Sequence, residues 1–193
     1  MTKKETILRA GARLFAKRSF NSVGIRDIAA EAGVNSAMIS YYFGGKGGLL
    51  REIFLRFDRL LSHESGRALE RATSQGDLIR RFVSSVLDSA RQNRDVYLVG
   101  LKELNHDSDE LQDLRADFHA KAEAVFMANI ERLGIHIPEN PAFRSLGFTA
   151  TLGLIFSDYL LGGCACVNDD TLLEAYKETV TKILWTGMQG YWA

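Results

Sequence analysis

Residues 25–43 read Ile-Arg-Asp-Ile-Ala-Ala-Glu-Ala-Gly-Val-Asn-Ser-Ala-Met-Ile-Ser-Tyr-Tyr-Phe, and this run predicts two short helices joined by a tight turn. Ile25, Ile28 and Ala29 lie at helical spacing and give the first helix one apolar face. Gly33 stands where the chain has to reverse, and glycine reaches a positive φ without a steric penalty from Cβ. The turn between the two helices is therefore expected at Gly33.

The second helix of the pair is expected from Ser36 onward, with Asn35 as its N-cap. Ile39 and Phe43 are four residues apart, so both are expected to point toward the protein interior. A short helix with a small, polar and aromatic outer face, held across a glycine turn by a preceding helix, is typical of a helix-turn-helix. The predicted outer face comprises Ser36, Ala37, Ser40 and Tyr41.

The rest of the chain also has the periodicity of helices, and no useful length of it alternates like a strand. Capping-box spacings mark helix starts at Thr2-x-x-Glu5, Asp107-x-x-Glu110 and Thr171-x-x-Glu174. We predict an all-α protein with a three-helix N-terminal domain and a six-helix body. The nine expected helices cover residues 3–17, 25–31, 36–42, 46–72, 77–92, 96–104, 108–133, 143–162 and 171–189.

The charged side chains are distributed unevenly, although the net charge of the whole chain is zero. Residues 1–51 hold nine lysines and arginines against three acids, a net charge of +6, and the remaining residues carry −6. A basic N-terminal module on an acidic body is typical of proteins that bind nucleic acid. Chance clustering of charges on a solvated surface is the alternative explanation.

Cys164 and Cys166 are the only two cysteines, and no other Cys or His lies close to them in the sequence. Two small apolar residues at a helix end explain the pair more simply than a redox or metal site, although such a site stays open. The N-terminus lacks the apolar run of a signal peptide. These features predict a cytoplasmic protein without structural disulfides.

The N-terminal residues resemble the TetR family of bacterial transcriptional regulators. The resemblance rests on Leu14-Phe15, Arg26-Asp27-Ile28-Ala29, Ala32-Gly33-Val34, Tyr41-Tyr42-Phe43, and Lys46 followed by Leu49-Leu50. Beyond these motifs the chain matches the family only in size and helical character. The resemblance implies a helix-turn-helix DNA-binding domain in residues 1–50 and an effector-binding and dimerisation domain in residues 51–193.

The resemblance also implies which side chains face DNA. Tyr41 and Tyr42 are expected to reach phosphates through their hydroxyls, and Lys46 to pair with a phosphate at the N-terminus of its helix. Arg26 is the best candidate for a base contact, since a bidentate arginine–guanine pair is the commonest specific contact. Core packing is the alternative for the tyrosines, and a solvated side chain is the alternative for Lys46. The full predicted set is Arg26, Asn35, Ser36, Ala37, Met38, Ser40, Tyr41, Tyr42 and Lys46.

Four positions depart from the residues common in the family. Gly24 replaces a Thr or Ser cap, Ser36 replaces a Lys, Met38 replaces a Thr, and Ser40 replaces a Tyr. The reading face is therefore small and weakly polar. Base recognition is expected to shift toward Arg26 and Asn35, which flank the second helix.

Residues 146–167 contain one charged side chain, Asp158. The run is long enough for a membrane span, but its four glycines, its central acid and the absence of flanking basic residues favour a helix buried on all sides. The resemblance implies that this helix and the last helix form a homodimer interface, whose C2 symmetry matches a palindromic operator. The predicted interface residues are Leu146, Ala150, Leu154, Tyr176, Val180, Ile183 and Leu184.

A small-molecule pocket is expected inside the body, although aromatic residues at helical spacing are usually plain core. Tyr97, His119 and Asp158 are the polar groups expected to orient a ligand. His119 and Glu123 have the i, i+4 spacing of a metal pair, but an exposed or hydrogen-bonded histidine is the simpler reading, so no metal or cofactor is predicted. The candidate lining residues are Phe57, Phe82, Val86, Tyr97, Leu101, Phe118, His119, Phe126, Phe148, Phe156 and Tyr159.

The expected function is that of a DNA-binding repressor released from its operator by an effector, through a shift of the long helix 46–72. A dimeric regulator that needs no effector is the alternative. An enzyme built on a helical bundle is a remote alternative, because the chain has no nucleophile elbow. The run Gly44-Gly45-Lys46-Gly47-Gly48 lacks the first glycine and the preceding strand of a phosphate loop.

Overall fold

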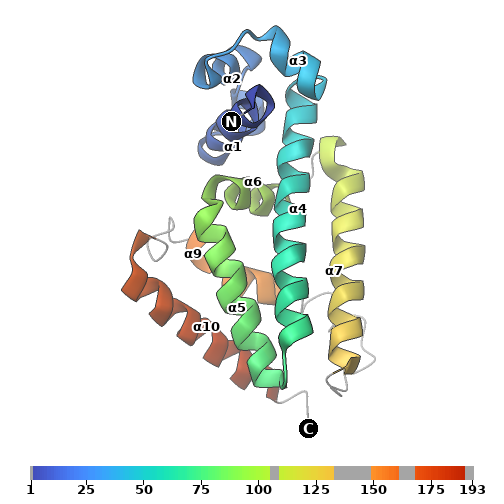
Figure 1. Ribbon diagram of the computed structural model, residues 1–193, viewed down its shortest axis with the longest axis vertical. Helices are drawn as coiled ribbons and strands as arrows, with labels where there is room; N and C mark the ends of the chain where they lie inside the picture. The colour runs from blue at the N-terminus through green and yellow to red at the C-terminus, as the bar shows by residue number, and fades with distance from the viewer. Residues whose placement is uncertain (1, 105–108, 133–148, 161–167, 190–193) are drawn as a thin grey trace. The chain divides into compact units, whose positions relative to one another are not determined.

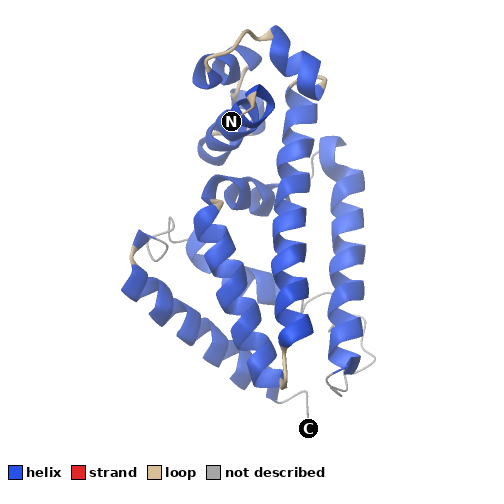
Figure 2. Cartoon of the chain, in the orientation of Figure 1, coloured by secondary structure: helices blue, strands red, loops and turns tan. Residues whose placement is uncertain are grey.

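The computed structural model describes residues 2–104, 109–132, 149–160 and 168–189, and within them it contains helices and no strand (Figure 2). The prediction of an all-α fold is confirmed. Residues 149–155 are helical, and two short 3-10 turns, η1 (Phe20–Ser22) and η2 (Asp109–Leu111), join longer helices. The helices labelled in Figure 1 are α1 (Lys3–Lys17), α2 (Ile25–Ala32), α3 (Ala37–Phe43), α4 (Lys46–Arg71), α5 (Gln75–Gln92), α6 (Arg94–Leu104), α7 (Gln112–Arg132), α9 (Ser157–Leu160) and α10 (Asp170–Gln189).

The chain divides into two compact units. The first unit comprises residues 1–59 and 93–117, and the second comprises residues 60–92 and 118–193. The first unit therefore adds α6 and the start of α7 to the N-terminal helices, and α4 and α7 each contribute residues to both units. The division into domains after residue 50 stays a prediction.

In the first unit, α1 packs against α2 and α6, and polar contacts hold both of its ends. At the start, the hydroxyl of Thr2 accepts the backbone N–H of Glu5 at 3.2 Å, which confirms the predicted cap. The Glu5 carboxylate accepts the Arg56 guanidinium of α4 at 2.9 Å. At the other end, the Lys102 ammonium of α6 donates to the carbonyl oxygen of Ala16, one of the carbonyls that a helix C-terminus leaves without a partner. α1 is thus tied to α4 and to α6.

The close approach of α6 to α4 in the first unit depends on Gly100. A Cβ at this position would collide with the Phe57 ring, so only glycine lets the α6 backbone lie on that ring. The Tyr97 ring meets Phe57 edge-on at a centroid distance of 5.4 Å, and both side chains are fully buried. Phe57 and Tyr97 therefore fill the core of the first unit.

Arg51 explains why α7 begins later than predicted. Its guanidinium forms a bidentate pair with the Asp113 carboxylate, with both N–O distances at 2.7 Å, and also donates to the Glu110 carbonyl oxygen at 2.7 Å. Because the Glu110 carbonyl is held by Arg51, the chain forms the 3-10 turn η2 there, and α7 starts at Gln112 instead of residue 108. Hydrogen bonding from Arg51 lowers the pKa of Asp113 to about 2.

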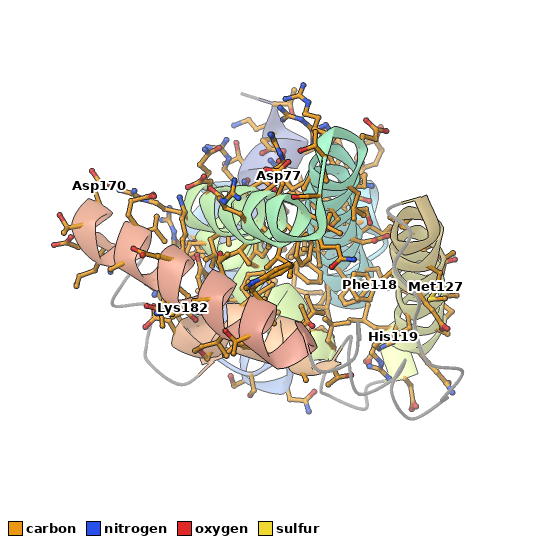
Figure 3. The ribbon with its side chains drawn as sticks, turned by 90° about the horizontal axis from the view of Figure 1, so that it is seen from below. Asp77, Phe118, His119, Met127, Asp170 and Lys182 are labelled. Carbon is orange, nitrogen blue, oxygen red and sulfur yellow. The ribbon has the colours of Figure 1, made fainter. Side chains whose placement is uncertain are left out.

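In the second unit, α5 and α10 lie antiparallel (Figure 1). The Arg91 guanidinium, near the end of α5, pairs with Asp170 at the start of α10. The buried Lys177 ammonium donates to Asp88 at 2.6 Å and to Glu174 at 2.7 Å, so its charge is compensated from both helices. Figure 3 shows α10 from below, with Asp170 and Lys182 labelled along it.

Two predicted helix starts in the second unit were wrong. α5 begins at Gln75 rather than at residue 77, because the Ser74 hydroxyl accepts the Asp77 N–H at 3.2 Å and caps the helix. α10 begins at Asp170 rather than Thr171, since the Asp169 carboxylate accepts the N–H of Leu172 at 3.0 Å. In both cases the helix is capped by a side chain that precedes the predicted first residue.

The predicted continuous helix 143–162 is interrupted, within its described part, by a turn at Phe156. The Tyr176 hydroxyl of α10 lies at this break. It accepts the backbone N–H of Asp158 at 3.2 Å and lies 3.0 Å from the carbonyl oxygen of Ile155 and 2.8 Å from the Ser157 hydroxyl. One side chain from α10 thus satisfies backbone groups that the break leaves without helical partners. Tyr176 acts within its own chain.

The turn between α3 and α4 is built from glycines. Gly44 and Gly45 have φ angles of 73° and 118°, which side chains with a Cβ rarely adopt. A Cβ at Gly48 would collide with the carbonyl oxygen of Phe43, the last residue of α3. The first turn of α4 can therefore lie directly against the end of α3 only because residue 48 is glycine.

We predict that Gly48→Ala destabilises the protein by about 2 kcal/mol or more, because the added methyl forces α3 away from α4. Gly66→Ala is the matched control. Gly66 lies on the same helix, and no atom lies within 4 Å of a Cβ added there. Gly66→Ala should therefore stabilise the protein by about 0.5–1 kcal/mol through helix propensity. Urea unfolding at fixed protein concentration measures the free energy of unfolding of both variants. Equal effects of the two substitutions would contradict this account of the turn.

Candidate nucleic-acid interface

The reversal between α2 and α3 is a left-handed turn at Gly33. Its backbone has φ 62° and ψ 40°, which confirms the prediction of a positive φ there. The Gly33 N–H donates to the carbonyl of Ala30 at 3.2 Å, and the N–H of Val34 donates to the carbonyl of Ala29 at 3.0 Å. This pair of bonds is the Schellman pattern, which ends a helix and fixes the direction of the following segment. α2 and α3 therefore form a helix-turn-helix.

The start of α2 keeps a side-chain cap despite Gly24. The Asp27 carboxylate reaches back and accepts the Gly24 N–H at 3.0 Å. The Arg18 guanidinium donates to the same carboxylate at 3.3 Å and also to the carbonyl oxygen of Ser22. The hydrogen bond from Gly24, followed by the charge of Arg18, lowers the pKa of Asp27. The sequence contains the signal for this cap in the Gly-x-x-Asp spacing, but the cap was not predicted because a glycine offers no capping side chain.

The whole predicted outer face of α3 is exposed. Ser36, Ala37, Ser40 and Tyr41 are all exposed, and 82% of the Tyr41 surface is accessible. Ile39 is fully buried, and Phe43 is half-buried, so the inner face also matches the prediction. The Asn35 side-chain oxygen accepts the Ala37 N–H at 2.9 Å, which confirms Asn35 as the N-cap. The assigned helix starts one residue later than predicted, at Ala37, although Ser36 already has helical dihedral angles, φ −56° and ψ −31°.

The two tyrosines of α3 differ in exposure. Tyr42 is 36% exposed, against 82% for Tyr41, and the two rings meet edge-on at 5.0 Å. The Tyr42 ring also lies 6.4 Å from that of Phe43. Tyr42 is thus partly packed against its neighbours, whereas Tyr41 extends into solvent. Met38 is half-buried, so a smaller fraction of its side chain is accessible than of Ser36 or Ser40.

Several of the N-terminal cationic side chains are held in ion pairs. Among the nine lysines and arginines of residues 1–51, four pair with carboxylates: Arg9 with Glu5, Arg13 with Glu31, Arg18 with Asp27, and Arg51 with Asp113. Arg26, at the start of α2, is exposed and has no ion-pair partner among the described residues. Arg26 is therefore an available guanidinium beside the helix-turn-helix.

Lys46 is not a free surface lysine. Its ammonium donates to the carbonyl oxygen of Phe20 at 2.9 Å and lies 4.2 Å from the centroid of the Phe20 ring. The side chain is half-buried at the first position of α4. Sequence reasoning did not identify Phe20, because it lies 26 residues earlier in a segment expected to be a plain loop.

The predicted pocket residues are split between the two units. Phe57, Tyr97 and Leu101 are buried in the first unit, and Phe82, Val86, Phe118, Phe156 and Tyr159 belong to the second. Phe118 is buried whereas its neighbour His119 is exposed, and Figure 3 labels both. The side chain of Phe126, and all of Phe148, lie outside the described residues. The pocket stays a prediction.

The predicted dimer residues differ in how much of their surface is exposed. Ala150 and Ile183 are exposed, and Leu154 and Leu184 are half-buried. Val180 is 2% exposed and packs within its own chain, as the half-buried Tyr176 does through its hydroxyl. Leu146, like Cys164 and Cys166, lies outside the described residues.

Metal-site and membrane-span features are both missing from the described part of the chain. No group of three or more His, Cys, Asp or Glu side chains there has the arrangement of a metal site. None of the helices described combines the length and the apolar character that crossing a bilayer requires. Most of the apolar run 146–167 lies outside the residues that the structure describes.

Comparison with known proteins agrees with this geometry. Residues 7–53 match the family described as bacterial regulatory proteins, tetR family. The N-terminal part of the chain, residues 7–53, therefore matches the TetR family. The matched residues include α2, the Gly33 turn, α3 and the start of α4.

Curated relatives resemble part of the chain. A probable HTH-type transcriptional regulator, YttP of Bacillus subtilis, is 28% identical over 66% of this chain and 63% of its own length. The HTH-type transcriptional repressor Rv3405c of Mycobacterium tuberculosis is 34% identical over 46% of this chain and 59% of its own length. The matches thus span about three fifths of those relatives.

Solved structures share the fold over nearly the whole chain. A TetR-family transcriptional regulator from Bordetella parapertussis matches with a TM-score of 0.79 at 17% identity, covering 94% of this chain and 93% of its own. PfmR, a TetR-family regulator from Thermus thermophilus, matches with a TM-score of 0.68 at 20% identity, covering 92% and 96%. At these identities the likeness establishes the fold.

We predict that the stabilising effect of the Asp27 charge disappears in acid. Its folded-state pKa lies below the ordinary value of 3.8, so its contribution is present above that value and is lost as the pH falls through the lowered pKa. Asp27→Asn keeps an acceptor for Gly24 but removes the charge. The difference in unfolding midpoint between wild type and Asp27→Asn should be constant above about pH 5 and should shrink below about pH 4. A difference that does not vary with pH would show that the charge is irrelevant.

Proposed function

We propose that this protein is a sequence-specific transcriptional regulator that binds operator DNA as a homodimer. The observation that carries the proposal is the α2–Gly33–α3 unit, whose outer helix exposes small polar side chains and Tyr41. A helix of this kind enters the major groove of DNA in helix-turn-helix proteins. The names of the curated relatives, which are transcriptional regulators and a repressor, support the same function.

In this proposal α3 recognises DNA mainly by fitting closely into the major groove, and less by hydrogen bonds to the base edges. Ser36, Ala37 and Ser40 are short, so the helix backbone can lie close to the base edges. Met38 contributes an apolar contact to thymine methyl groups or sugars. Asn35 uses its side-chain oxygen to cap α3, which leaves its amide N–H groups for a base or a phosphate. The hydroxyls of Tyr41 and Tyr42 donate to phosphates, which fix the position of the helix on the duplex.

Arg26 is assigned the main base contact. It is the exposed guanidinium of the helix-turn-helix without an ion-pair partner among the described residues, so DNA binding does not require an internal pair to break. Bidentate pairing with guanine uses the planar fork of the guanidinium. Lys46, at the N-terminus of α4, is assigned a phosphate, where the helix dipole adds to its charge.

The proposed dimer forms through α10 and the helical segment before it. Leu172 and Ile183 are 54% and 50% exposed, and they lie eleven residues apart, which places them on one face of α10. Ala175 and Thr179 are exposed between them, so this face carries no charge along its length. Covering such a stripe with the same stripe of a second copy is an isologous contact, and its C2 symmetry matches two operator half-sites.

The proposed regulation is release by a small-molecule effector bound in the second half of the chain. α4 contributes residues to both compact units, so a ligand that favours one position of α4 changes the separation of the two reading helices. A regulator without an effector is the alternative. A thermal-shift screen separates them, since an effector raises the unfolding temperature and also releases the DNA.

We predict that Arg26→Ala weakens specific DNA binding by about 10- to 100-fold and relaxes sequence preference at one position in each half-site. Fluorescence anisotropy with a duplex from the region upstream of its own gene measures this, with a scrambled duplex for non-specific binding. Arg13→Ala is the matched control, because Arg13 is an exposed arginine of the same unit that is paired with Glu31. Its effect should be less than about twofold.

The salt dependence provides the second readout. Binding by wild type should fall by about a thousandfold or more between roughly 50 and 200 mM salt, since each subunit neutralises several phosphates. Equal weakening by Arg26→Ala and Arg13→Ala would reject the assigned base contact. Absence of specific binding to any fragment of the neighbouring genomic region would reject the proposed function.

A further inference from the structure

Phe20 and Lys46 form a contact that the assigned DNA contacts do not include. Phe20 opens η1, between α1 and α2, and Lys46 opens α4. The Lys46 ammonium lies on the Phe20 ring at 4.2 Å from the centroid and donates to the carbonyl oxygen of the same residue at 2.9 Å. One residue therefore binds the ammonium in two ways, through its ring and through its backbone.

This contact restricts the lysine before any ligand arrives. An exposed lysine side chain samples many rotamers, and ordering it on a phosphate costs conformational entropy. Here the ring supplies a cation–π attraction and the carbonyl supplies a hydrogen bond, so the half-buried side chain is already ordered. An ammonium has three N–H donors, and the Phe20 carbonyl takes one. Two donors are left for a phosphate.

The Phe20 ring is itself held in place. It packs at 5.7 Å from the ring of Phe15, which is buried in α1. The chain offers an internal comparison in Lys4, whose ammonium lies 5.7 Å from the centroid of the Phe43 ring. The shorter distance and the added hydrogen bond to a carbonyl distinguish Lys46 from a lysine that only passes over an aromatic ring.

We propose that Phe20 is a positioning residue for DNA binding, which holds the Lys46 ammonium at the start of α4 ready to meet a phosphate. The inference rests on the proposed function, because it assumes that Lys46 contacts DNA. It adds a residue outside the helix-turn-helix to the binding machinery. It also makes a specific claim: Phe20 acts on DNA affinity through Lys46 and not through the stability of the fold.

A double-mutant cycle on the full-length dimer tests this claim. Wild type, Phe20→Leu, Lys46→Met and the double variant are titrated with the operator duplex at several salt concentrations. Lys46→Met should lower the slope of log K against log salt by about 2, one phosphate per subunit, whereas Lys17→Met, at an exposed lysine of α1, should leave the slope unchanged. Phe20→Leu should weaken binding by about tenfold, because the Lys46 side chain of each subunit must then be ordered when it binds a phosphate, and should keep the wild-type slope.

The coupling between the Phe20 and Lys46 substitutions shows whether Phe20 positions Lys46 or has only a structural role. If Phe20 acts through Lys46, adding Phe20→Leu to Lys46→Met weakens binding no further. If Phe20→Leu weakens binding equally in both backgrounds, or not at all, the inference is overturned. Phe20→Tyr keeps the ring and the backbone carbonyl, so it should bind DNA like wild type. It also keeps the test valid if the leucine variant unfolds.

A measurement without DNA separates the inference from the proposed function. In the free protein, the Lys46 side-chain protons next to nitrogen should show an upfield ring-current shift in NMR spectra, which Phe20→Leu removes. Absence of that shift overturns the inference, whatever the DNA result. Failure of wild type to bind any specific duplex, with the shift present, overturns the proposed function instead.

Discussion

The contact between the end of α3 and the first turn of α4 is the constraint on which the proposed interface depends. The Phe43 carbonyl lies where a Cβ of residue 48 would be, and the preceding turn uses two residues with positive φ, Gly44 and Gly45. The outer helix of the helix-turn-helix is only seven residues long. A helix that short has little stability of its own, so its orientation comes from the helices that hold it. The glycine run makes α4 the element that holds α3.

The electrostatic character of the N-terminal region follows from its ion pairs more than from its net charge. Arg9, Arg13 and Arg18 each have a carboxylate partner in the same unit: Arg9 within α1, Arg13 between α1 and α2, and Arg18 at the residue that caps α2. Exposed pairs contribute little to stability, but they take those guanidinium groups out of competition for DNA. Arg26, Lys4 and the two remaining donors of Lys46 are then charges that stay available close to the reading helix. The positions of these available charges support a specific DNA contact, and the net charge of +6 in residues 1–51 does not by itself do so.

Local signals in the sequence predicted the elements that local chemistry determines. The α1 bounds, the Gly33 turn and the Thr2 cap followed from periodicity, glycine and capping spacing, and the structure agrees with each. Contacts between residues distant in the sequence were not predictable in this way. Nothing near Glu110 signals that Arg51 binds its carbonyl, and nothing near Phe156 signals that the helix breaks there beside the Tyr176 hydroxyl. For the site, the exposed face of α3 was predictable, whereas the role of Phe20 depends on a fold that brings it to Lys46.

The central claim is that two copies of the helix-turn-helix read DNA together, and hydroxyl-radical footprinting of the bound operator tests it most directly. Two recognition helices in successive major grooves should protect two half-sites related by twofold symmetry, with centres about 10–10.5 base pairs, or 34–36 Å, apart. A longer spacing at a whole number of helical turns keeps both helices on one side of the duplex and is also consistent. A single protected segment without a symmetry mate, or uniform protection along the fragment, would contradict the account.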